Sequence, residues 1–448
     1  MTPLRMRALL VLTLLAGCAS YAPDPLRNDP AVLALPAAEI LQRRAEAITR
    51  SWLTPARIDL DAPLDANAVA TLAVLNNPDL IALRAHAGVA DAQVFAAGLL
   101  PDPSFSLGAD RVLRGPDTLL NLTAALGLDL NALRNRTLTR AQAIARARSV
   151  RLDLAWAEWQ TAGQARLQAV RILGLQRQLP LLEAGAQAAR MQAEQALRAA
   201  ARGDLANSEA QALRLTAFDA DTRLRDARQQ LQQAEQSLAR LLGLPSDRVL
   251  PLAAQPLPPP PPTAARLFEL ARRERADLAA LRAGYDAQEA SVRLAVQRQF
   301  PTLNLTINGN RDSAGNLLLG PAVDFTLPLW NRNRGDIAIE RATRSALKAD
   351  YEARLFQTRA DLDAAVTALQ QARDQLAQAR VDAEALQQRA QAAQAAQARG
   401  DLPAAAALVI EQAWRDRNLL IVQLEQTIAE QTLAVELLCG VPLFQELQ

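Results

Sequence analysis

Histidine and cysteine, the usual ligands of structural zinc, are rare in this chain of 448 residues and lie far apart in the sequence. The chain has one histidine, His86, and two cysteines, Cys18 and Cys439. A zinc site needs several such ligands close together, and a nucleophile needs a base beside it. No second ligand candidate lies three or four residues from His86. We therefore expect a surface histidine, no metal site, no cofactor and no catalytic residue, and we do not expect an enzyme.

Cys18 is the residue whose surroundings predict a covalent modification. Arg5 and Arg7 precede a short apolar run that ends in Leu15-Ala16-Gly17-Cys18. This run is too short to span about 30 Å of hydrocarbon, so residues 1–17 are interpreted as a signal peptide. The last four residues resemble a lipobox, in which the cysteine is acylated, for example with palmitate; an ordinary signal peptide is the alternative. Cys439 is expected to be a small buried residue near a helix end.

The overall composition favours long helices and argues against nucleic-acid binding. The net charge is only +2, and no basic stripe with interleaved aromatic residues occurs. Aromatic residues make up 4% of the chain, whereas alanine is abundant, which suits helices that approach each other closely. A PxxP partner motif is the less favoured use of the Pro258–Pro262 run, which is interpreted as an extended linker.

Two stretches alternate with period two inside a chain that otherwise has helical periodicity. The first predicts strands at about 103–110 and 119–130, and the second predicts strands at about 301–310 and 321–329. In the second stretch the apolar residues continue to Leu327 and Leu329. Polar residues, among them Arg311–Asn316, separate the two strands and suit a hairpin loop. The chain is therefore predicted to form two β-hairpins.

The landmarks of the two halves recur at a nearly constant offset. Pro301 follows Pro103 by 198 residues, and the Arg-Gly-Asp-Leu segments that begin at Arg202 and Arg399 lie 197 residues apart. The predicted unit is a helix, a hairpin, a long helix, a turn and a returning helix, present twice. The organisation is then a signal peptide (1–17), a lipid-anchored extended arm (18–61), a first repeat (62–245), a Pro-rich linker (246–262) and a second repeat (263–445).

The helices are expected to be very long. One helix is predicted over about 64–98 and another over about 263–299, each before a hairpin. Helices over about 137–201 and 336–399 follow the hairpins and would measure roughly 100 Å. Pro180 has Ala377 at the matching place, so we expect a kink in one copy only.

Glycines mark the turns and the packed face of these helices. Gly203 and Gly400 are expected to end the long helices, with Asp204 and Asp401 capping the returning helices and Pro403 at the second helical position. Three glycines recur every eleven residues along the first long helix, which predicts close packing on one stripe: Gly163, Gly174 and Gly185.

The hairpins suggest a membrane channel. Strands of nine to twelve residues with one apolar face match tilted transmembrane strands, and helices of this length cannot wrap around a small hairpin. Four strands cannot close a barrel, so the chain must oligomerise. Two copies would give eight strands with a lumen filled by side chains, and three copies would give twelve strands with room for water. The residues expected to face lipid share the apolar side of the strands: Phe105, Leu107, Leu122, Leu303, Leu305, Ile307 and Phe325.

The chain resembles the TolC-type outer-membrane efflux family. The resemblance covers about residues 64–445 and rests on the duplicated unit, the two Arg-Gly-Asp-Leu turns, and the segments Leu241–Pro245 and Leu327–Gly335. The last segment looks most like the heavy-metal efflux branch. The resemblance implies a mainly α fold with a transmembrane β-barrel: a homotrimer with a twelve-stranded barrel in the outer membrane and an α-barrel in the periplasm.

The resemblance also implies partners and sites. It implies an exit duct that takes substrates from an inner-membrane pump, of the RND type, through a periplasmic membrane fusion (adaptor) protein. The adaptor-docking tips would be Gly203, Asp204, Leu205, Gly400, Asp401 and Leu402. Family members carry acidic residues at the periplasmic entrance, but here Pro403 to Ile410 is apolar. Glu209 and Glu411 are the candidates that remain, and a constriction of apolar side chains is the alternative.

Two other functions are compatible with parts of the sequence. A periplasmic coiled-coil scaffold or adaptor lipoprotein would explain the helices and the anchor but would leave four amphipathic strands without a purpose. The exit channel of a type I secretion system would differ only in its cargo, which the pump selects.

Overall fold

The computed structural model describes residues 21–26, 37–111, 113–114, 120–312 and 315–443. Contacts divide the chain into Met1–Pro36 and a second unit, Ala37–Gln448, here called the helix–sheet unit. In the first unit, residues 21–26 have no regular structure and are exposed. The predicted signal peptide and Cys18 lie outside the described residues.

The helix–sheet unit contains one order of elements twice. The first set is α3 (Ala66–Asn76), α4 (Pro78–Gly98), β1 (Ser104–Arg111), β2 (Leu120–Asp129), α5 (Leu130–Ala201) and α6 (Asn207–Leu241). The second set is α7 (Ala264–Glu274), α8 (Ala276–Gln297), β3 (Thr302–Arg311), β4 (Leu317–Thr326), α9 (Arg334–Arg399) and α10 (Ala404–Cys439). A short helix, α2 (Ala38–Glu46), precedes both sets.

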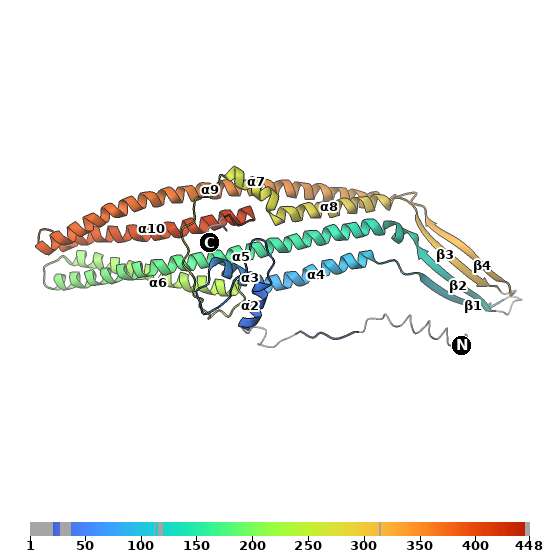
Figure 1. Cartoon of the computed structure of the whole chain (residues 1–448), viewed down its shortest axis with the longest axis horizontal. Helices are drawn as coiled ribbons and strands as arrows, with labels where there is room; N and C mark the ends of the chain where they lie inside the picture. The colour runs from blue at the N-terminus through green and yellow to red at the C-terminus, as the bar shows by residue number, and fades with distance from the viewer. Residues whose placement is uncertain (1–20, 27–36, 112, 115–119, 313–314, 444–448) are drawn as a thin grey trace. The chain divides into compact units, whose positions relative to one another are not determined.

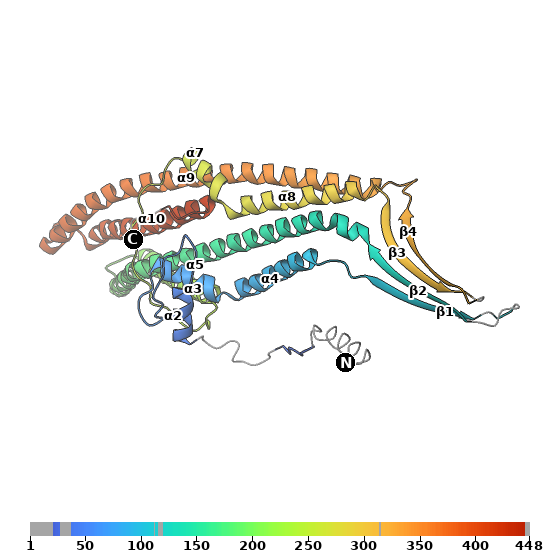
Figure 2. The ribbon, with the colours of Figure 1, turned by 45° about the vertical axis from the view of Figure 1, so that its right-hand side comes forward.

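The long helices run side by side, with the sheet at one end of the unit and the helix turns at the other (Figure 1). Helix α5 contacts α4 and α6 as well as α8 and α10, whereas α9 contacts α8 and α10. Figure 2 shows the same rows after a rotation of 45°. Helices α5 and α9 are thus the continuous elements, and the shorter helices pack beside them. Helix α5 continues through Pro180 without a break.

The helices predicted over 64–98 and 263–299 are each broken in two, which corrects the prediction. Asn77 has an extended backbone (φ −61°, ψ 124°), and its side chain accepts from the Leu80 N–H at 3.0 Å. Pro78 is then the first residue of α4, where its missing N–H costs nothing. Arg275 is extended in the same way (φ −62°, ψ 122°) between α7 and α8.

Two further boundaries differ from those predicted. Helix α5 starts at Leu130 instead of about 137, because Asp129 accepts hydrogen bonds from the Asn131 and Ala132 N–H groups and caps it directly after β2. The arm predicted to be extended contains α2, because Leu41 and Ala45 pack into the core around α3 and α5.

The four strands form one antiparallel sheet in the order β1-β2-β3-β4, with β1 and β4 at its edges. The last strand covers Leu317–Thr326, not about 321–329, so Leu327 and Leu329 lie outside it. Arg311 pairs with Leu317 directly beside the loop, and Thr302 pairs with Thr326 at the opposite end. Pro328, which has no N–H to donate, stands where the ladder stops.

Candidate functional site

The sheet has one apolar face. Cross-strand partners in an antiparallel sheet share a face, and the register joins Phe105 to Leu126 and Leu126 to Ile307. The same rows contain all seven residues predicted to face lipid, and also further apolar residues: Leu120, Ala124, Leu128, Leu317, Leu319 and Val323. Phe105 is 69% exposed and Leu107 is 75% exposed. The apolar face is therefore uncovered within this chain.

The opposite face of the sheet is mainly polar. Ser106 pairs with Ala125, Asp110 with Asn121, and Asn304 with Asp324. The side-chain amide oxygens of Asn121 and Asn310 are buried and lack a hydrogen-bond partner among the described residues. A sheet with one apolar face and one polar face can pack its apolar face on a protein core, or it can separate lipid from water.

The two helix turns at the other end have the same geometry. Gly203 and Gly400 both have φ +83°, the left-handed conformation that ends a helix and favours glycine. The Asp204 N–H donates to the Ala199 carbonyl at 2.9 Å, and the Asp401 N–H donates to the Ala396 carbonyl at 2.9 Å. Leu205 and Leu402 are half-buried beside them.

The aspartates at these turns do not cap the returning helices, which corrects the prediction. Helix α6 starts after Ala206 and α10 after Pro403, and neither start has a side-chain cap. Asp204 instead accepts from the Arg202 Nε at 2.9 Å, and Asp401 accepts from the Arg399 Nε at 2.9 Å. Each turn therefore presents an exposed ion pair next to a glycine.

The two candidates for an acidic entrance differ in their surroundings. Glu209 is exposed in the first turn of α6. Glu411 is half-buried on α10 and forms an ion pair with Arg415 one helical turn later. The charge of Glu411 is thus compensated by Arg415, which weakens the case for an acidic ring at that level.

The glycine stripe of α5 packs closely at two of its three positions. A Cβ atom on Gly163 would overlap Leu437, and one on Gly174 would overlap Gln426, both on α10. At Gly185 a Cβ atom would meet no atom within 4 Å, so the prediction is wrong for that residue. Gly185 instead lines a groove between α5, α6 and α10, together with Ala189, Ala220 and Leu408.

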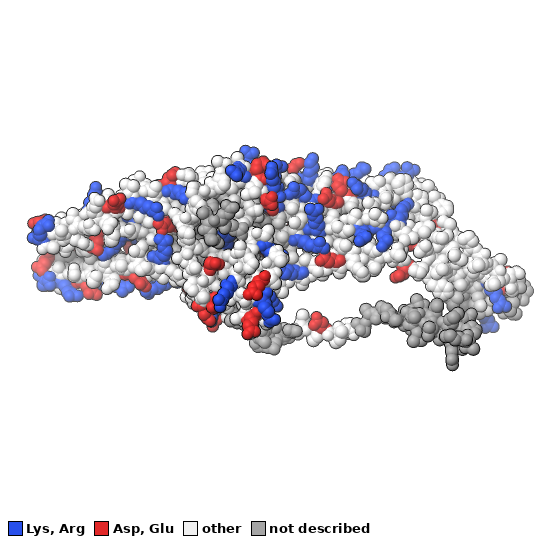
Figure 3. Space-filling view, in the orientation of Figure 1, with Lys and Arg blue, Asp and Glu red and all other residues white. Residues whose placement is uncertain are grey.

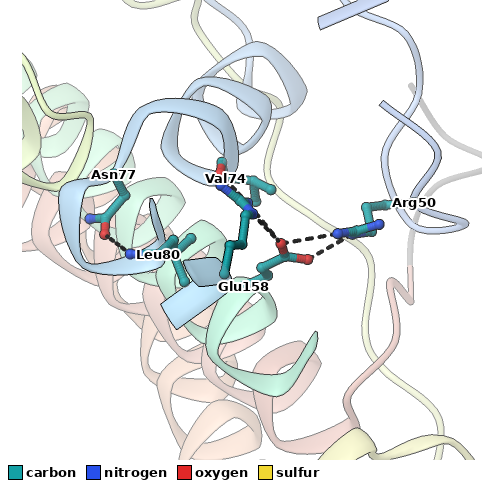
Figure 4. A network of polar contacts seen from close by, with 6 residues as sticks. Arg50, Val74, Asn77, Leu80 and Glu158 are labelled. Atoms are coloured by element: carbon teal, nitrogen blue, oxygen red, sulfur yellow. Dashed lines mark hydrogen bonds and ion pairs between the residues drawn. The ribbon is translucent and has the colours of Figure 1, made fainter. Parts of the chain in front are cut away.

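A buried ion pair that the sequence analysis missed holds the arm onto the helices (Figure 4). Glu158 on α5 is 0% exposed. Arg50 of the arm contacts its carboxylate at 2.6 and 3.0 Å, and Arg84 of α4 contacts it at 2.7 and 3.0 Å. The Arg84 guanidinium also donates to the Val74 carbonyl at 2.5 Å. Glu158 thus joins the arm, α3, α4 and α5.

The broken helices are tied to the ends of the returning helices. The Asn77 side chain donates to the Leu241 carbonyl at 2.9 Å, and Arg275 donates to the Leu438 carbonyl at 2.9 Å. Arg275 also makes two bonds to Asp277, at 2.9 and 2.7 Å, and lies over the Trp156 ring at 4.6 Å. The break between α3 and α4 is therefore held by a neutral side chain, and the break between α7 and α8 is held by a charged one.

The residues with intrinsic reactivity lie apart from these features. His86 is exposed on α4. Cys439 is fully buried at the end of α10, and burial raises the pKa of its thiol to about 12. Among the residues that the structure describes, no three histidine, cysteine or acidic side chains are grouped so that they could hold a metal ion. No helix within the described ranges is long and apolar enough to cross a membrane.

Part of the chain matches a known protein family. Residues 267–441 match the family model described as "Outer membrane efflux protein". Solved structures with the same fold include the CmeC outer membrane channel of Campylobacter jejuni, with a TM-score of 0.68 and 15% identity over 94% of both chains. The open-state MtrE outer membrane channel of Neisseria gonorrhoeae matches with a TM-score of 0.67 and 15% identity, over 89% of this chain and 96% of its own.

A curated relative gives the more specific similarity. The chain is 26% identical over 301 residues to the cobalt-zinc-cadmium resistance protein CzcC of Cupriavidus metallidurans, covering 65% of this chain and 68% of CzcC. The family match over residues 267–441, this relative and the shared fold together support an outer-membrane efflux protein. The family description and these solved structures are those of outer-membrane proteins and channels, not of enzymes.

Proposed function

We propose that the protein is the exit duct of a tripartite efflux system, which conducts substrates passively from an inner-membrane pump and a periplasmic adaptor across the outer membrane. The observation that carries the proposal is the uncovered apolar face of the sheet at the end of the unit opposite the two helix turns. A strand of 10 residues is about 33 Å long and, when tilted, spans the roughly 25 Å apolar band of an outer-membrane barrel.

The duct is a homotrimer in this proposal. The single chain has a four-stranded sheet with unpaired edges at β1 and β4, which hydrocarbon does not tolerate. Three copies joined edge to edge would close a twelve-stranded barrel, wide enough for water. The polar face, with residues such as Asn304 and Asp324, would then line the lumen.

The helix turns are the docking tips of the adaptor in this proposal. They are exposed, lie at the far end from the sheet, and present the same Gly-Asp geometry twice in each chain. A trimer would therefore offer six similar tips. The resting entrance would be narrowed by apolar side chains more than by Glu209 or Glu411, because Arg415 compensates Glu411.

The similarity to a cobalt-zinc-cadmium resistance protein supports a heavy-metal pump of the RND type as the partner. Metal ions would be cargo in transit. The acylated Cys18 would hold the N-terminus in the outer membrane, with the helices extending into the periplasm.

Single-channel conductance tests the duct. Protein purified in detergent is added to planar bilayers, and its oligomeric mass is measured in the same detergent. We expect trimers with discrete conductance steps. Monomers or dimers without conductance would favour a periplasmic scaffold and would contradict the duct.

The docking tips are tested by export in cells. Gly400→Pro or Asp401→Arg is expected to leave trimers in the outer membrane and to abolish export, because the tips no longer match the adaptor. The control is Gly185→Ala on α5, away from the tips, where an added Cβ atom would meet no atom within 4 Å. Normal export by both tip variants would exclude docking at this turn.

A further inference from the structure

The two arginines of the strands lie on the apolar face, at its loop end. Alternation along β1 places Arg111 on the face of Phe105 and Leu107, and it pairs with Leu120. Arg311 occupies the row of Leu122 and Leu317, both apolar. The acidic residues of the strands, Asp110, Asp129 and Asp324, lie on the other face. The charges of the sheet are thus sorted by sign.

Neither arginine is neutralised by another side chain among the described residues. Both side chains are exposed, and within the described part of the chain neither guanidinium has a hydrogen bond or an ion pair. Figure 3 shows basic atoms at the outer end of the sheet, beyond a surface that is mostly uncharged. An unpaired charge on an apolar face is costly unless it reaches polar surroundings, which a long arginine side chain can do by extending past the hydrocarbon.

The opposite end of the apolar face has aromatic residues instead. Phe300 precedes β3 and is 55% exposed, and Trp330 follows β4 and is 90% exposed. Aromatic side chains are typical of the interfacial level of a membrane protein. The apolar rows are therefore bounded by aromatic side chains at the helix end and by guanidinium groups at the loop end.

We propose that Arg111 and Arg311 form a binding site for the phosphate groups of an anionic lipid of the outer leaflet, a phosphorylated glycolipid. The proposal rests on the duct function, which places the loop end of the sheet at the outer surface. The two arginines are separated by one strand and by one two-residue step of the register, so they lie on the order of 10 Å apart. Guanidinium groups bind phosphate oxygens bidentately, which gives the site its preference.

Native mass spectrometry of the detergent-solubilised protein tests this site. The probes are bis-phosphorylated lipid A and the same lipid after removal of both phosphates. Each arginine should raise the affinity for the phosphorylated lipid about fivefold, so the wild-type protein should prefer this lipid over the dephosphorylated one by about 25-fold. The double variant Arg111→Gln/Arg311→Gln should lose this preference, and Arg111→Lys/Arg311→Lys, which keeps both charges but not the bidentate geometry, should keep only part of it.

The control is Arg341→Gln/Arg389→Gln, which removes two exposed arginines of α9 and should change nothing. A preference that survives in Arg111→Gln/Arg311→Gln overturns the lipid site, as does a wild-type protein that retains both lipids equally. Conductance is recorded for every variant in bilayers of neutral lipid. A protein that shows the lipid preference but remains a monomer or dimer without conductance would contradict the duct and leave the site intact.

Discussion

Glu158 has a fully buried carboxylate that forms ion pairs with two arginines, Arg50 and Arg84. A buried carboxylate is stable only when its charge and lone pairs are satisfied, and here four contacts do so. Arg50 brings the arm to this point, and the Trp52 ring packs edge-on against Trp159 with 5.1 Å between centroids. The arm is thus part of the folded unit.

Replacing Glu158 by Gln should destabilise the unit and release the arm. The variant leaves Arg50 and Arg84 without a counter-charge, and because both arginines are about one-third exposed we expect a loss of roughly 2–3 kcal/mol. Thermal unfolding followed by circular dichroism measures the loss, and limited proteolysis at residues 47–61 reports release of the arm.

The matched control for this variant is Glu183→Gln on the same helix. Glu183 pairs with Arg228 at 2.7 Å, but both side chains are at least half exposed, so its loss should cost well under 1 kcal/mol. Equal melting of Glu158→Gln and wild type would show that the buried contacts contribute nothing net.

Among the elements, α5 and α10 approach most closely where glycine permits it. Their axes are held together at Gly163 and Gly174 and leave a groove at Gly185, nearer the helix turns. The contact therefore changes along one helix pair, from close packing near the middle of the unit to an open groove towards the turns.

The glycine substitutions should separate these two regions. Gly163→Ala forces Leu437 to move and should lower the free energy of unfolding by about 1–3 kcal/mol, whereas Gly185→Ala should be neutral or stabilise by up to about 1 kcal/mol. Thermal midpoints of the two variants, measured side by side, check the prediction. A similar destabilisation at both positions would contradict the difference in packing.

Glu425 of α10 joins the two long helices. It accepts from Arg177 of α5 at 2.5 Å and from Arg380 of α9 at 2.8 Å. Burial by itself would raise the pKa of this carboxyl group, but the hydrogen bonds from Arg380 and Arg177 outweigh it and hold the pKa below its ordinary value. The carboxylate form is therefore the form that stabilises the fold.

The contribution of Glu425 should depend on pH with a definite sign. Because its pKa is lower in the folded chain, the stabilisation is complete above the pKa of the unfolded chain, near 4.5, and is lost as the pH falls through the folded pKa. Glu425→Gln should cost on the order of 1 kcal/mol at pH 7 and nothing in strong acid. Melting curves recorded from pH 7 to about pH 3 measure whether the stabilities of Glu425→Gln and wild type converge as the pH falls. A difference in melting temperature that stays constant over this range would contradict the prediction.

The predictability of these elements from sequence depended on local periodicity. Alternation predicted the hairpins and placed Leu305 and Thr306 on opposite faces, as the register has them. The break at Asn77-Pro78 had a local signal, since Asn-Pro begins many helices, and the 198-residue offset pointed from there to Arg275. Arg50 and Glu158 are 108 residues apart in the sequence, and no periodic pattern of residues indicates that they are in contact.

At the scale of the whole molecule, the two faces of the sheet should respond oppositely to charge. Leu305→Arg puts a cation on the apolar face and should cost roughly 2–4 kcal/mol if its row lies near the bilayer midplane, which prevents insertion. Thr306→Arg puts the same side chain on the polar face and should leave assembly intact. The amount of heat-resistant trimer in outer-membrane fractions measures the assembly of each variant. Equal amounts of trimer for Leu305→Arg and Thr306→Arg would contradict the barrel.

The unpaired edges of β1 and β4 also fix an order of events in time. In the proposed trimer, a single chain can complete the helix contacts that are internal to it, but the edges of its sheet would pair only with other copies. Before such pairing, the sheet has unpaired backbone N–H and C=O groups along β1 and β4 and an uncovered apolar face, and both features promote aggregation. If the duct is the proposed trimer, closure of its barrel would await an encounter between copies, and the single subunit would be the form most prone to aggregate.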